Sequence, residues 1–383
     1  MRIVCAAEAW GFGPVSKLIT VIEPFLETAE CVFLGKGCAV DFAKLHPLKE
    51  TWCIETPVSD SRVPAILTDA DVFLNVMDRD YLPFTSLCPM VYVDILFWFW
   101  ETAPLEAANV ARYFVQNWLG LEQRVTEWRS VLPTLELVGP IMREVPVAPA
   151  KCRENKVVIG FGGMDNPYVT TGINSEYPFV MLENILPVLK SLEIGKVVVT
   201  GRGRILAELA ERFPSPKIVY RMLSRQEMLQ ELASASCFLT APGLESMLDA
   251  AMCQTPCFYL LPQNNSNLVQ LQMYREYGIG DYSVAFADVF PEFTFERNHD
   301  QSVEMAKIIG YLQKLSTLPQ IGVLQEKLRQ FFADRNRWHV LVEKQTKLLR
   351  SLGGNGVERV RETVLDLGDS ECKRKTSKLS LSI

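Results

Sequence analysis

A pair of short apolar runs, residues 237–239 and 257–261, restricts the fold of this chain more than any other feature. Each run is typical of a buried parallel strand. Pro242 and Gly243 interrupt the chain after the first run, apolar residues then recur at helical spacing, and Pro256 ends the helical pattern. Because parallel strands must be joined by a crossover, the segment predicts a strand, a glycine turn, a helix and a second strand of an α/β domain.

The rest of the chain alternates in the same way, with short helical patterns between apolar runs, which argues for mostly parallel sheets. The predicted strands before residue 140 are 2–9, 31–34, 51–54, 72–76, 90–93, 113–115 and 135–138. The predicted strands between residue 150 and the two runs above are 157–161, 196–200 and 218–220. Residues 140–155 contain three prolines and indicate a linker between two domains.

The helix predicted after Gly243 carries three polar residues, Glu245, Ser246 and Asp249. The glycine turn places free backbone N–H groups at the N-terminus of this helix, where an anion binds well. Residues 245 and 249 are one helical turn apart, so both carboxylates can share a face. One of them suits a ribose diol, as acidic residues do in dinucleotide-binding folds. The alternative is a solvated helix face beside an ordinary turn.

This stretch resembles the nucleotide-sugar half of the peptidoglycan N-acetylglucosaminyltransferase and its two-domain relatives, the GT-B glycosyltransferases. In those proteins a glycine turn precedes a helix with an acidic residue, and a proline, an apolar strand and a Gln/Asn-rich loop follow. The corresponding residues here are Gly243, Asp249, Pro256, Gln263, Asn264 and Asn265, with Gln270 and Gln272 after them.

The resemblance implies that Asp249 binds the ribose, that Gly243 and Ser246 lie near the diphosphate, and that residues 263–265 face the sugar. Aspartate stands here where the family has glutamate, so the ribose contact would be shorter.

The resemblance also implies the domain organisation, with two doubly wound Rossmann-like α/β domains facing across a cleft. Residues 1–145 would form the acceptor-binding domain and residues 146–335 the nucleotide-sugar-binding domain. We expect a helix over 336–352 to cross back to the N-terminal domain. Residues 353–383 are polar, and we expect them to form a mostly flexible tail, or one that is partly helical around 356–365.

Three carboxylates follow strands of the N-terminal sheet and are the candidate catalytic residues. Ligands of parallel sheets bind beyond the carboxyl ends of the strands. Asp94 is preferred as the general base, because the aromatic residues that follow it would exclude water and raise its pKa. Asp78 ranks second and Glu8 third. The alternative for each is a helix cap or a turn former.

A glycine-bearing loop, Gly11, Phe12 and Gly13, follows the first strand. It is an incomplete dinucleotide-binding fingerprint, because Ser16 occupies the position of the third glycine. In GT-B glycosyltransferases such a loop touches the acceptor or the phosphate, so the resemblance implies an acceptor-binding role.

Trp98 and Asn117 complete the predicted acceptor-binding set. Trp98 belongs to the aromatic run 97–100, which offers a flat surface to a ring-shaped acceptor. Asn117 follows the strand at 113–115. The aromatic run has two other interpretations, a part of the domain core or a contact with a membrane surface. The apolar run 90–100 around it is too short to span a bilayer.

Glycine turns also follow the first two strands of the C-terminal sheet. Gly162 and Gly163 follow the first strand, and Arg202 and Arg204 lie in the turn after the second. Two arginines in such a turn can hold a phosphate by bidentate bonds, although a solvated basic turn is the alternative. The residues predicted to border the base pocket are Arg221, Met222 and Leu223.

Composition excludes several classes of protein. A net charge of −6 does not indicate a nucleic-acid-binding surface. Ten cysteines without a C-x-x-C pair, and without a recognisable signal peptide, indicate free thiols in a cytoplasmic protein. The three histidines are far apart, so we expect no metal site, and no cofactor is expected beyond the nucleotide-sugar donor. No integral membrane segment is expected, and a homodimer is left open.

Three further motifs, at residues 11–18, 75–78 and 92–98, resemble the cytosylglucuronate synthase group. That group joins glucuronate from its UDP ester to cytosine in nucleoside antibiotic biosynthesis. Ile95 stands here where that group has serine.

The two resemblances together imply a glycosyltransferase of the hexosyltransferase class. It would move a sugar from a UDP-sugar, with UDP-glucuronate as the first candidate, to a small acceptor such as a nucleobase, by single displacement without a metal. The alternatives are a nucleotide-sugar hydrolase or 2-epimerase on the same fold, and a non-catalytic UDP-sugar-binding partner protein.

Overall fold

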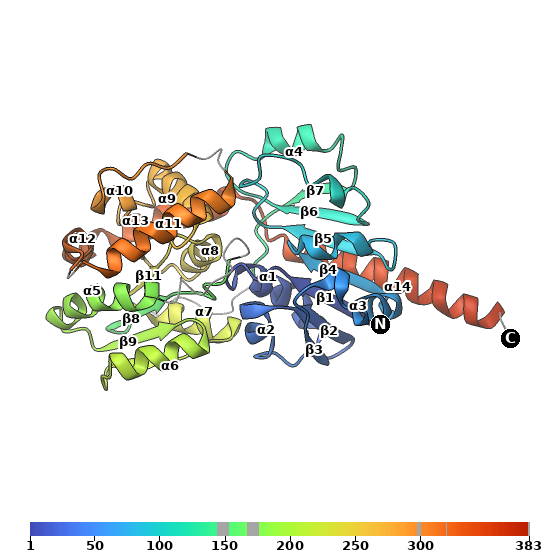
Figure 1. The fold of residues 1–383 in the computed structure, drawn as a ribbon, viewed down its shortest axis with the longest axis horizontal. Helices are drawn as coiled ribbons and strands as arrows, with labels where there is room; N and C mark the ends of the chain where they lie inside the picture. Colours follow the sequence, from blue (N-terminus) through green and yellow to red (C-terminus); the bar gives the residue numbers. More distant parts are fainter. Residues whose placement is uncertain (144–152, 167–175, 297–299, 319, 382–383) are drawn as a thin grey trace. The chain divides into compact units, whose positions relative to one another are not determined.

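The computed structural model divides the chain into two compact units (Figure 1). Unit 1 comprises Met1–Glu144 and Leu352–Ile383, and unit 2 comprises Val145–Ser351. The structure describes residues 1–143, 153–166, 176–296, 300–318 and 320–381. Residues 144–152 of the predicted linker therefore lie outside the described residues.

Unit 1 is built on a seven-stranded parallel sheet of order β3-β2-β1-β4-β5-β6-β7. The strands are β1 (Arg2–Ala7), β2 (Glu30–Gly35), β3 (Glu50–Cys53), β4 (Val72–Val76), β5 (Met90–Asp94), β6 (Arg112–Gln116) and β7 (Leu135–Val138). Every residue of β4 and β5 is buried, as expected of strands covered on both faces. The chain reverses its direction across the sheet between β1 and β4, which makes this pair the topological switch point.

Short helices connect these strands, and α1 is the most enclosed of them. The α-helices are α1 (Gly13–Ile22), α2 (Gly37–Ala43), α3 (Arg62–Asp69) and α4 (Glu122–Trp128), with the 3₁₀ turns η1 (Glu23–Phe25), η2 (Pro57–Ser59), η3 (Arg79–Phe84) and η4 (Leu105–Ala107). Pro14 stands in the first turn of α1, where its missing N–H costs nothing. Every residue of α1 from Pro14 to Ile22 is buried.

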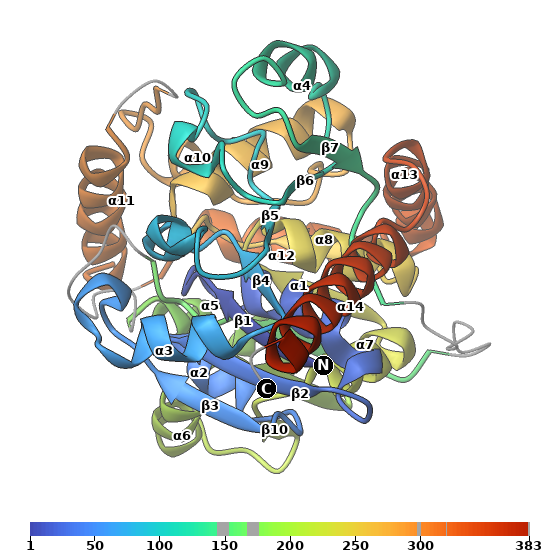
Figure 2. The same ribbon diagram turned by 90° about the vertical axis from the view of Figure 1, so that its right-hand side faces the viewer.

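The C-terminal segment differs from its prediction, because most of it is the helix α14 (Val357–Leu381) rather than a flexible tail. Val357, Val360 and Val364 are buried at helical spacing, and α14 contacts α1 and β4. Figures 1 and 2 show α14 running beside α1. The buried apolar residues of this long polar segment are mainly these three valines, so the sequence indicated at most a partial helix around 356–365.

The segment that leaves unit 1, residues 139–142, binds the segment that returns to it, residues 354–355. The Asn355 side chain donates to the Met142 carbonyl at 2.7 Å and accepts from the Met142 N–H at 3.2 Å. A Cβ at Gly139 would lie 1.6 Å from the carbonyl oxygen of Gly354, so glycine alone permits this approach. The two segments therefore pack backbone against backbone.

Unit 2 contains a five-stranded parallel sheet of order β10-β9-β8-β11-β12. The strands are β8 (Lys156–Gly160), β9 (Lys196–Thr200), β10 (Ile218–Tyr220), β11 (Cys237–Thr240) and β12 (Cys257–Tyr259). The helices are α5 (Tyr177–Ser191), α6 (Gly203–Arg212), α7 (Arg225–Ser234), α8 (Leu244–Met252), α9 (Asn265–Tyr277), α10 (Phe286–Val289), α11 (Gln301–Ser316), α12 (Gly322–Ala333) and α13 (Trp338–Ser351). The predicted fold class of two doubly wound parallel α/β domains is confirmed.

The helix predicted to cross back over 336–352 is placed differently. It corresponds to α13, which belongs to unit 2 and contacts α8. The 3₁₀ turn η6 (Arg335–Arg337) separates α13 from α12. The chain re-enters unit 1 only at Leu352, whose carbonyl accepts a hydrogen bond from the Asn117 side chain at 3.0 Å.

None of the helices that the structure describes is both long and apolar enough to cross a membrane. The described buried cysteines, including Cys5, Cys31, Cys237 and Cys257, are free thiols.

Candidate active site

Asp78 is held at the end of β4 by the side chain of a buried neighbour in the same turn. The Asn75 amide donates to the Asp78 carbonyl at 2.8 Å and accepts from the Asp78 N–H at 3.0 Å. Between them Met77 has a φ of +66°, a conformation that non-glycine residues rarely adopt. Such strain persists only where the surrounding structure enforces it, and it clusters at functional sites. The Asp78 side chain is 2% exposed, and its Oδ1 accepts from the Asp80 N–H at 3.1 Å.

Glu8 lies beside Asp78 at the end of the neighbouring strand. Ala7 of β1 pairs with Val76 of β4, and the Glu8 N–H donates to the Val76 carbonyl at 3.0 Å. The Glu8 carboxylate is partly exposed, and Oε1 accepts from the Ala9 N–H at 3.0 Å. The switch point of the sheet therefore carries two adjacent carboxylates.

Neighbouring charges act on this pair from β2 and η3. Lys36, which follows β2, forms an ion pair with Asp80 at 3.0 Å. Burial raises the pKa of Asp78 to about 8, and the Glu8 carboxylate adds to the rise while Lys36 opposes it. Burial also raises the pKa of Glu8, against the attraction of Lys36. The pair thus holds on to one proton near neutral pH.

Asp94, the preferred base from the sequence, has a different environment. It ends β5 and is 1% exposed. Its Oδ1 accepts from the Leu96 N–H at 2.9 Å, and its Oδ2 accepts from the Tyr113 hydroxyl at 2.7 Å and the Trp100 indole N–H at 2.9 Å. Burial raises the pKa of Asp94, as the sequence predicted, and the hydrogen bond from Tyr113 opposes the rise. Both oxygens are engaged in holding the loop that follows β5.

The aromatic run after Asp94 forms part of the core of unit 1. Phe97, Trp98 and Phe99 are 0%, 2% and 3% exposed. The Arg124 guanidinium fixes the run by donating to the carbonyls of Phe97, Trp98 and Trp100 at 3.2, 3.0 and 2.6 Å. Phe97, Trp98 and Phe99 therefore belong to the core, whereas Trp100 is half-buried. The burial of Trp98 leaves it no open ring face for an acceptor.

The other predicted acceptor residues lie at the same edge of the sheet. Gly11 has a φ of +62° and Gly13 begins α1, and a Cβ at Gly11 would meet nothing within 4 Å. Phe12 packs against Phe42 with 5.1 Å between ring centroids. Asn117 binds the returning chain at Leu352, which gives it a structural role.

In unit 2, glycine turns follow three neighbouring strands at their carboxyl ends. Gly162, with a φ of +66°, and Gly163 follow β8, Gly201 follows β9, and Gly243 precedes α8. The structure shows no side-chain cap at the N-terminus of α6 or α8 among the described residues. The first backbone N–H groups of these helices can therefore receive an anion. Ser246, in the first turn of α8, accepts a hydrogen bond from the Thr240 hydroxyl at 3.3 Å.

Asp249, predicted to bind ribose, lies in a buried ion-pair cluster. Both of its oxygens bind the Arg225 guanidinium, which also pairs with Glu245 at 2.8 Å. The side chains of Arg225, Asp249 and Glu245 are 5%, 4% and 15% exposed. Burial alone would lower the pKa of Arg225, but the two carboxylates outweigh it and the pKa lies above its ordinary value. Of the two acids, Glu245 is the one nearer the surface.

The predicted phosphate-binding arginines differ in how they are held. Arg202, the N-cap residue of α6, binds Asp165 of the β8 loop at 2.8 and 3.1 Å, and its side chain is 31% exposed. The Arg204 side chain is 87% exposed and pairs with Glu208 one turn along α6, as in a solvated helix face.

The residues predicted to border the base pocket follow β10. Arg221 pairs with Glu227 at 2.9 Å, Leu223 is 4% exposed, and Met222 lies near Gly203.

The Gln/Asn-rich segment connects β12 to α9 and is largely buried. The Gln263 amide donates to the Phe161 carbonyl at 3.1 Å, which ties it to the glycine turn after β8. Asn264 caps α9 by accepting from the Asn267 N–H at 2.9 Å. Asn265 bonds to Gln301 at the start of α11. The segment thus borders the same edge of the sheet as the glycine turns.

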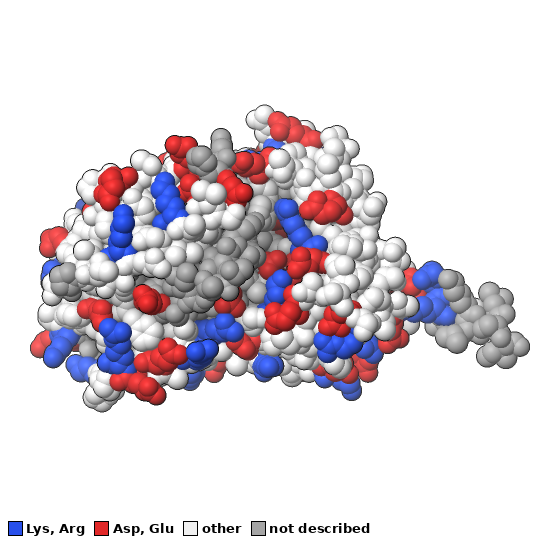
Figure 3. Space-filling model, viewed as in Figure 1, with Lys and Arg blue, Asp and Glu red and all other residues white. Residues whose placement is uncertain are grey.

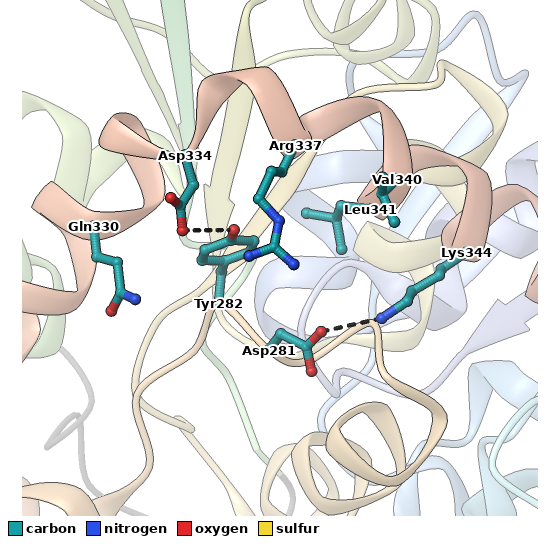
Figure 4. A pocket seen from close by; sticks show the side chains of 8 residues that line it. All are labelled: Asp281, Tyr282, Gln330, Asp334, Arg337, Val340, Leu341 and Lys344. Atoms are coloured by element: carbon teal, nitrogen blue, oxygen red, sulfur yellow. Dashed lines mark hydrogen bonds and ion pairs between the residues drawn. The ribbon is translucent and has the colours of Figure 1, made fainter.

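One surface hollow that is lined by described residues contains none of the predicted site residues. The hollow in Figure 4 has a volume of about 200 Å³ and lies between the loop at 281–282 and the segment from α12 to α13. Within it Lys344 pairs with Asp281 at 3.2 Å, and the Tyr282 hydroxyl donates to Asp334 at 3.0 Å (Figure 4). On the face shown in Figure 3, acidic and basic side chains are interspersed. The described residues contain no group of three or more His, Cys, Asp or Glu side chains placed to hold a metal.

Sequence reasoning missed two cations of these sites. Lys36 follows β2, so the same rule that selected Glu8 and Asp78, a polar residue at a strand end, could have found it. Arg225 belongs to α7 and reaches α8 only through tertiary packing, so no local signal pointed to it.

Comparisons with known proteins identify the fold. No family model matches the sequence, and the search of curated proteins gave no match. The crystal structure of Arabidopsis thaliana UGT89C1 complexed with UDP is similar with a TM-score of 0.50 and 12% identity, covering 96% of this chain and 99% of that chain. A UDP-glucosyltransferase from Polygonum tinctorium capable of glucosylating indoxyl gives 0.50 and 12%, covering 96% and 98%. MurG of Acinetobacter baumannii gives 0.49 and 12%, covering 95% and 99%. The likeness confirms the GT-B fold for this chain.

Proposed function

We propose that this chain is a glycosyltransferase that moves a sugar from a UDP-sugar to a small acceptor. The main supporting observation is the edge of the unit 2 sheet where three glycine turns lie beside the N-termini of α6 and α8, neither of which is capped by a side chain of the described residues. Such an edge suits a diphosphate. Two of the similar structures support the nucleotide, because one is complexed with UDP and the other is named a UDP-glucosyltransferase.

The proposed mechanism is a single displacement at the anomeric carbon. The N–H groups at the start of α8 and the Arg202 guanidinium stabilise the departing diphosphate, because fixed dipoles and a cation act where the negative charge develops. These groups can carry the charge of the leaving group without a metal. A carboxylate of unit 1 takes the proton of the acceptor. The ribose diol is bound by the acids of α8, Asp249 or the more exposed Glu245.

Finer details of the proposal rest on the sequence motifs. Residues 11–18, 75–78 and 92–98 support UDP-glucuronate as the donor and a nucleobase such as cytosine as the acceptor. This assignment would place the enzyme among hexosyltransferases, in nucleoside antibiotic biosynthesis in the cytoplasm.

A product assay tests the proposal. The full chain is incubated with UDP-glucose, UDP-N-acetylglucosamine or UDP-glucuronate, with and without an acceptor from a panel of cytosine, uracil and simple phenols. The products are identified and quantified by mass spectrometry. We expect a glycosylated acceptor and UDP in equal amounts. UDP and free sugar in unchanged yield without any acceptor would indicate the hydrolase instead, and a free or UDP-linked epimer would indicate the 2-epimerase. Binding of UDP without any turnover would indicate the silent binding protein.

A further inference from the structure

The switch point of the unit 1 sheet brings two carboxylates together from neighbouring strands. β1 and β4 are in register at Ala7 and Val76, and the Glu8 N–H extends the pairing by one more hydrogen bond. After Val76 the chain leaves the sheet through Met77 in the left-handed conformation. Glu8 and Asp78 therefore emerge beside one another, where ligands of doubly wound sheets bind.

The three candidate carboxylates differ in what their oxygens already bind. Asp94 accepts hydrogen bonds on both oxygens, from three donors. Asp78 is almost fully buried and is fixed through its backbone by Asn75. Glu8 is partly exposed, and while Oε1 accepts from the Ala9 N–H, no described residue donates to Oε2. Of the three, Glu8 is the one that is partly exposed and also has an oxygen to which no described residue donates.

We propose that Glu8 is the general base of the transfer. Asp78, held by Asn75, is the positioning residue, and its buried carboxyl group lies next to that of Glu8. The inference rests on the proposed glycosyltransferase function. It reverses the order in which the sequence ranked the three acids.

The step moves one proton and one pair of electrons. Glu8 Oε2 takes the proton of an acceptor O–H or N–H, and the electron pair of that bond forms the new bond to the anomeric carbon. The bond between the anomeric carbon and the diphosphate oxygen breaks, and its electron pair leaves with UDP. The proton passes from Glu8 to solvent, which the partly exposed carboxylate can reach.

The surrounding charges favour this division of roles. Asp80 and Arg79 of η3 and Lys36 after β2 face the pair. Burial and the Glu8 charge raise the pKa of Asp78 to about 8, so near neutral pH the buried Asp78 holds a proton. The protonated Asp78 places no second negative charge beside Glu8.

Isosteric variants test the base directly. With the UDP-sugar and acceptor that the wild type turns over, Glu8→Gln should lower kcat by about a hundredfold or more and leave the KM for the UDP-sugar nearly unchanged. The matched control is Glu55→Gln, an exposed carboxylate beyond β3 at the same edge of the sheet, which should keep wild-type kcat. Near-normal kcat in Glu8→Gln, or loss confined to Asp94→Asn, would overturn the proposal. A wild type that turns over no UDP-sugar would instead refute the proposed function, and this inference with it.

Titration of the carboxyl groups tests the pairing without any substrate. In the full chain with ¹³C-labelled Glu and Asp, the Asp78 carboxyl signal should titrate with a midpoint near 8, and Glu8→Gln should move that midpoint downward because one cause of the raised pKa is removed. Glu55→Gln should leave it in place. An Asp78 midpoint that is unaffected by Glu8→Gln would show that the two groups do not interact, and would overturn the positioning role.

Discussion

Asp78 couples the stability of unit 1 to pH. Its pKa is about 8 in the folded chain, against an ordinary value of 3.8, because it is buried beside Glu8. The folded state therefore binds a proton that the unfolded state has released, and stability falls as pH rises from about 3.8 through about 8. Above that range the loss is complete. Glu8, whose pKa is also raised, acts in the same direction.

Asp78→Asn should therefore stabilise the chain at neutral and higher pH. Asparagine keeps the shape and an oxygen that can accept from the Asp80 N–H, and it removes the buried charge. We expect the melting temperature of the variant to exceed that of the wild type by a margin that grows between pH 4 and pH 8. Asp60→Asn is the matched control, because Arg62 lowers the pKa of the half-buried Asp60 to about 2, so its loss can only destabilise in that range. If the difference in melting temperature between the variant and the wild type does not change with pH, Asp78 does not couple stability to pH through a buried charge.

Removing the buried cation Arg225 should destabilise the chain, in contrast to the removal of the buried Asp78 charge. Replacing Arg225 by Met leaves Asp249 and Glu245 buried without their shared partner. Removing one member of a buried ion pair costs about 3–5 kcal/mol. Lys344→Met, which removes an exposed pair with Asp281, should cost about 1 kcal/mol or less. Urea unfolding of both variants compares them, and equal losses would mean that the cluster is not buried as described.

Arg202 and Arg204 form a matched pair for ligand binding. Arg202 lies in the turn between β9 and α6, whereas the Arg204 side chain extends into solvent. A hydrogen bond to a charged group contributes about 1.5–3 kcal/mol, so Arg202→Ala should weaken UDP binding by about tenfold or more and uridine binding less. Arg204→Ala should change neither. Equal losses for UDP and uridine in Arg202→Ala would assign Arg202 to the fold.

At the scale of elements, helix α14 is a part of unit 1. Beyond Asp366 it packs Gly368 against Met1, where a Cβ would lie 2.3 Å from the Met1 sulfur. Further along, Lys375 donates to the carbonyls of Asp69 and Ala70 at 3.1 and 2.7 Å, and so caps the end of α3. These contacts tie both the N-terminus and α3 to the last helix.

A chain that ends at Asp366 should therefore be less stable than the full chain, by about 1–3 kcal/mol for the lost caps and packing. A chain that ends at Ser377 keeps the named contacts and should unfold like the full chain. Denaturant unfolding measures both. If both shortened chains unfold at the same denaturant concentration, the contacts after Asp366 do not stabilise unit 1.

The sequence predicted strands better than helices, and the reason is burial. Strands such as β4, in which all five residues are buried, are short apolar runs between turn residues. By contrast, α9 begins with the buried polar residues Asn265, Ser266 and Asn267, which carry no apolar period. Helix α6 buries only Leu206 and Leu209, and α14 presents only a narrow valine stripe. Tertiary packing, not local pattern, defines these helices.

At the scale of the whole molecule, the sequence located the edges of the two sheets but not the roles of the side chains there. The rule that polar residues gather at strand ends selected Glu8, Asp78 and Asp94. Their order could not be derived, because it depends on which oxygens already accept hydrogen bonds from Tyr113, Trp100 and the backbone. The same limit applies to Asp249, whose partner Arg225 comes from another helix.

The central claim is that the chain binds a UDP-sugar, and calorimetric titration tests it most directly. UDP-glucose, UDP-glucuronate, dTDP-glucose and GDP-mannose are titrated separately into the full chain. We predict that at least one UDP-sugar binds at micromolar concentration, and that the dTDP- and GDP-sugars bind at least tenfold more weakly, about 1.4 kcal/mol. No heat of binding with any nucleotide-sugar, or equal affinity for all of them, would contradict the account.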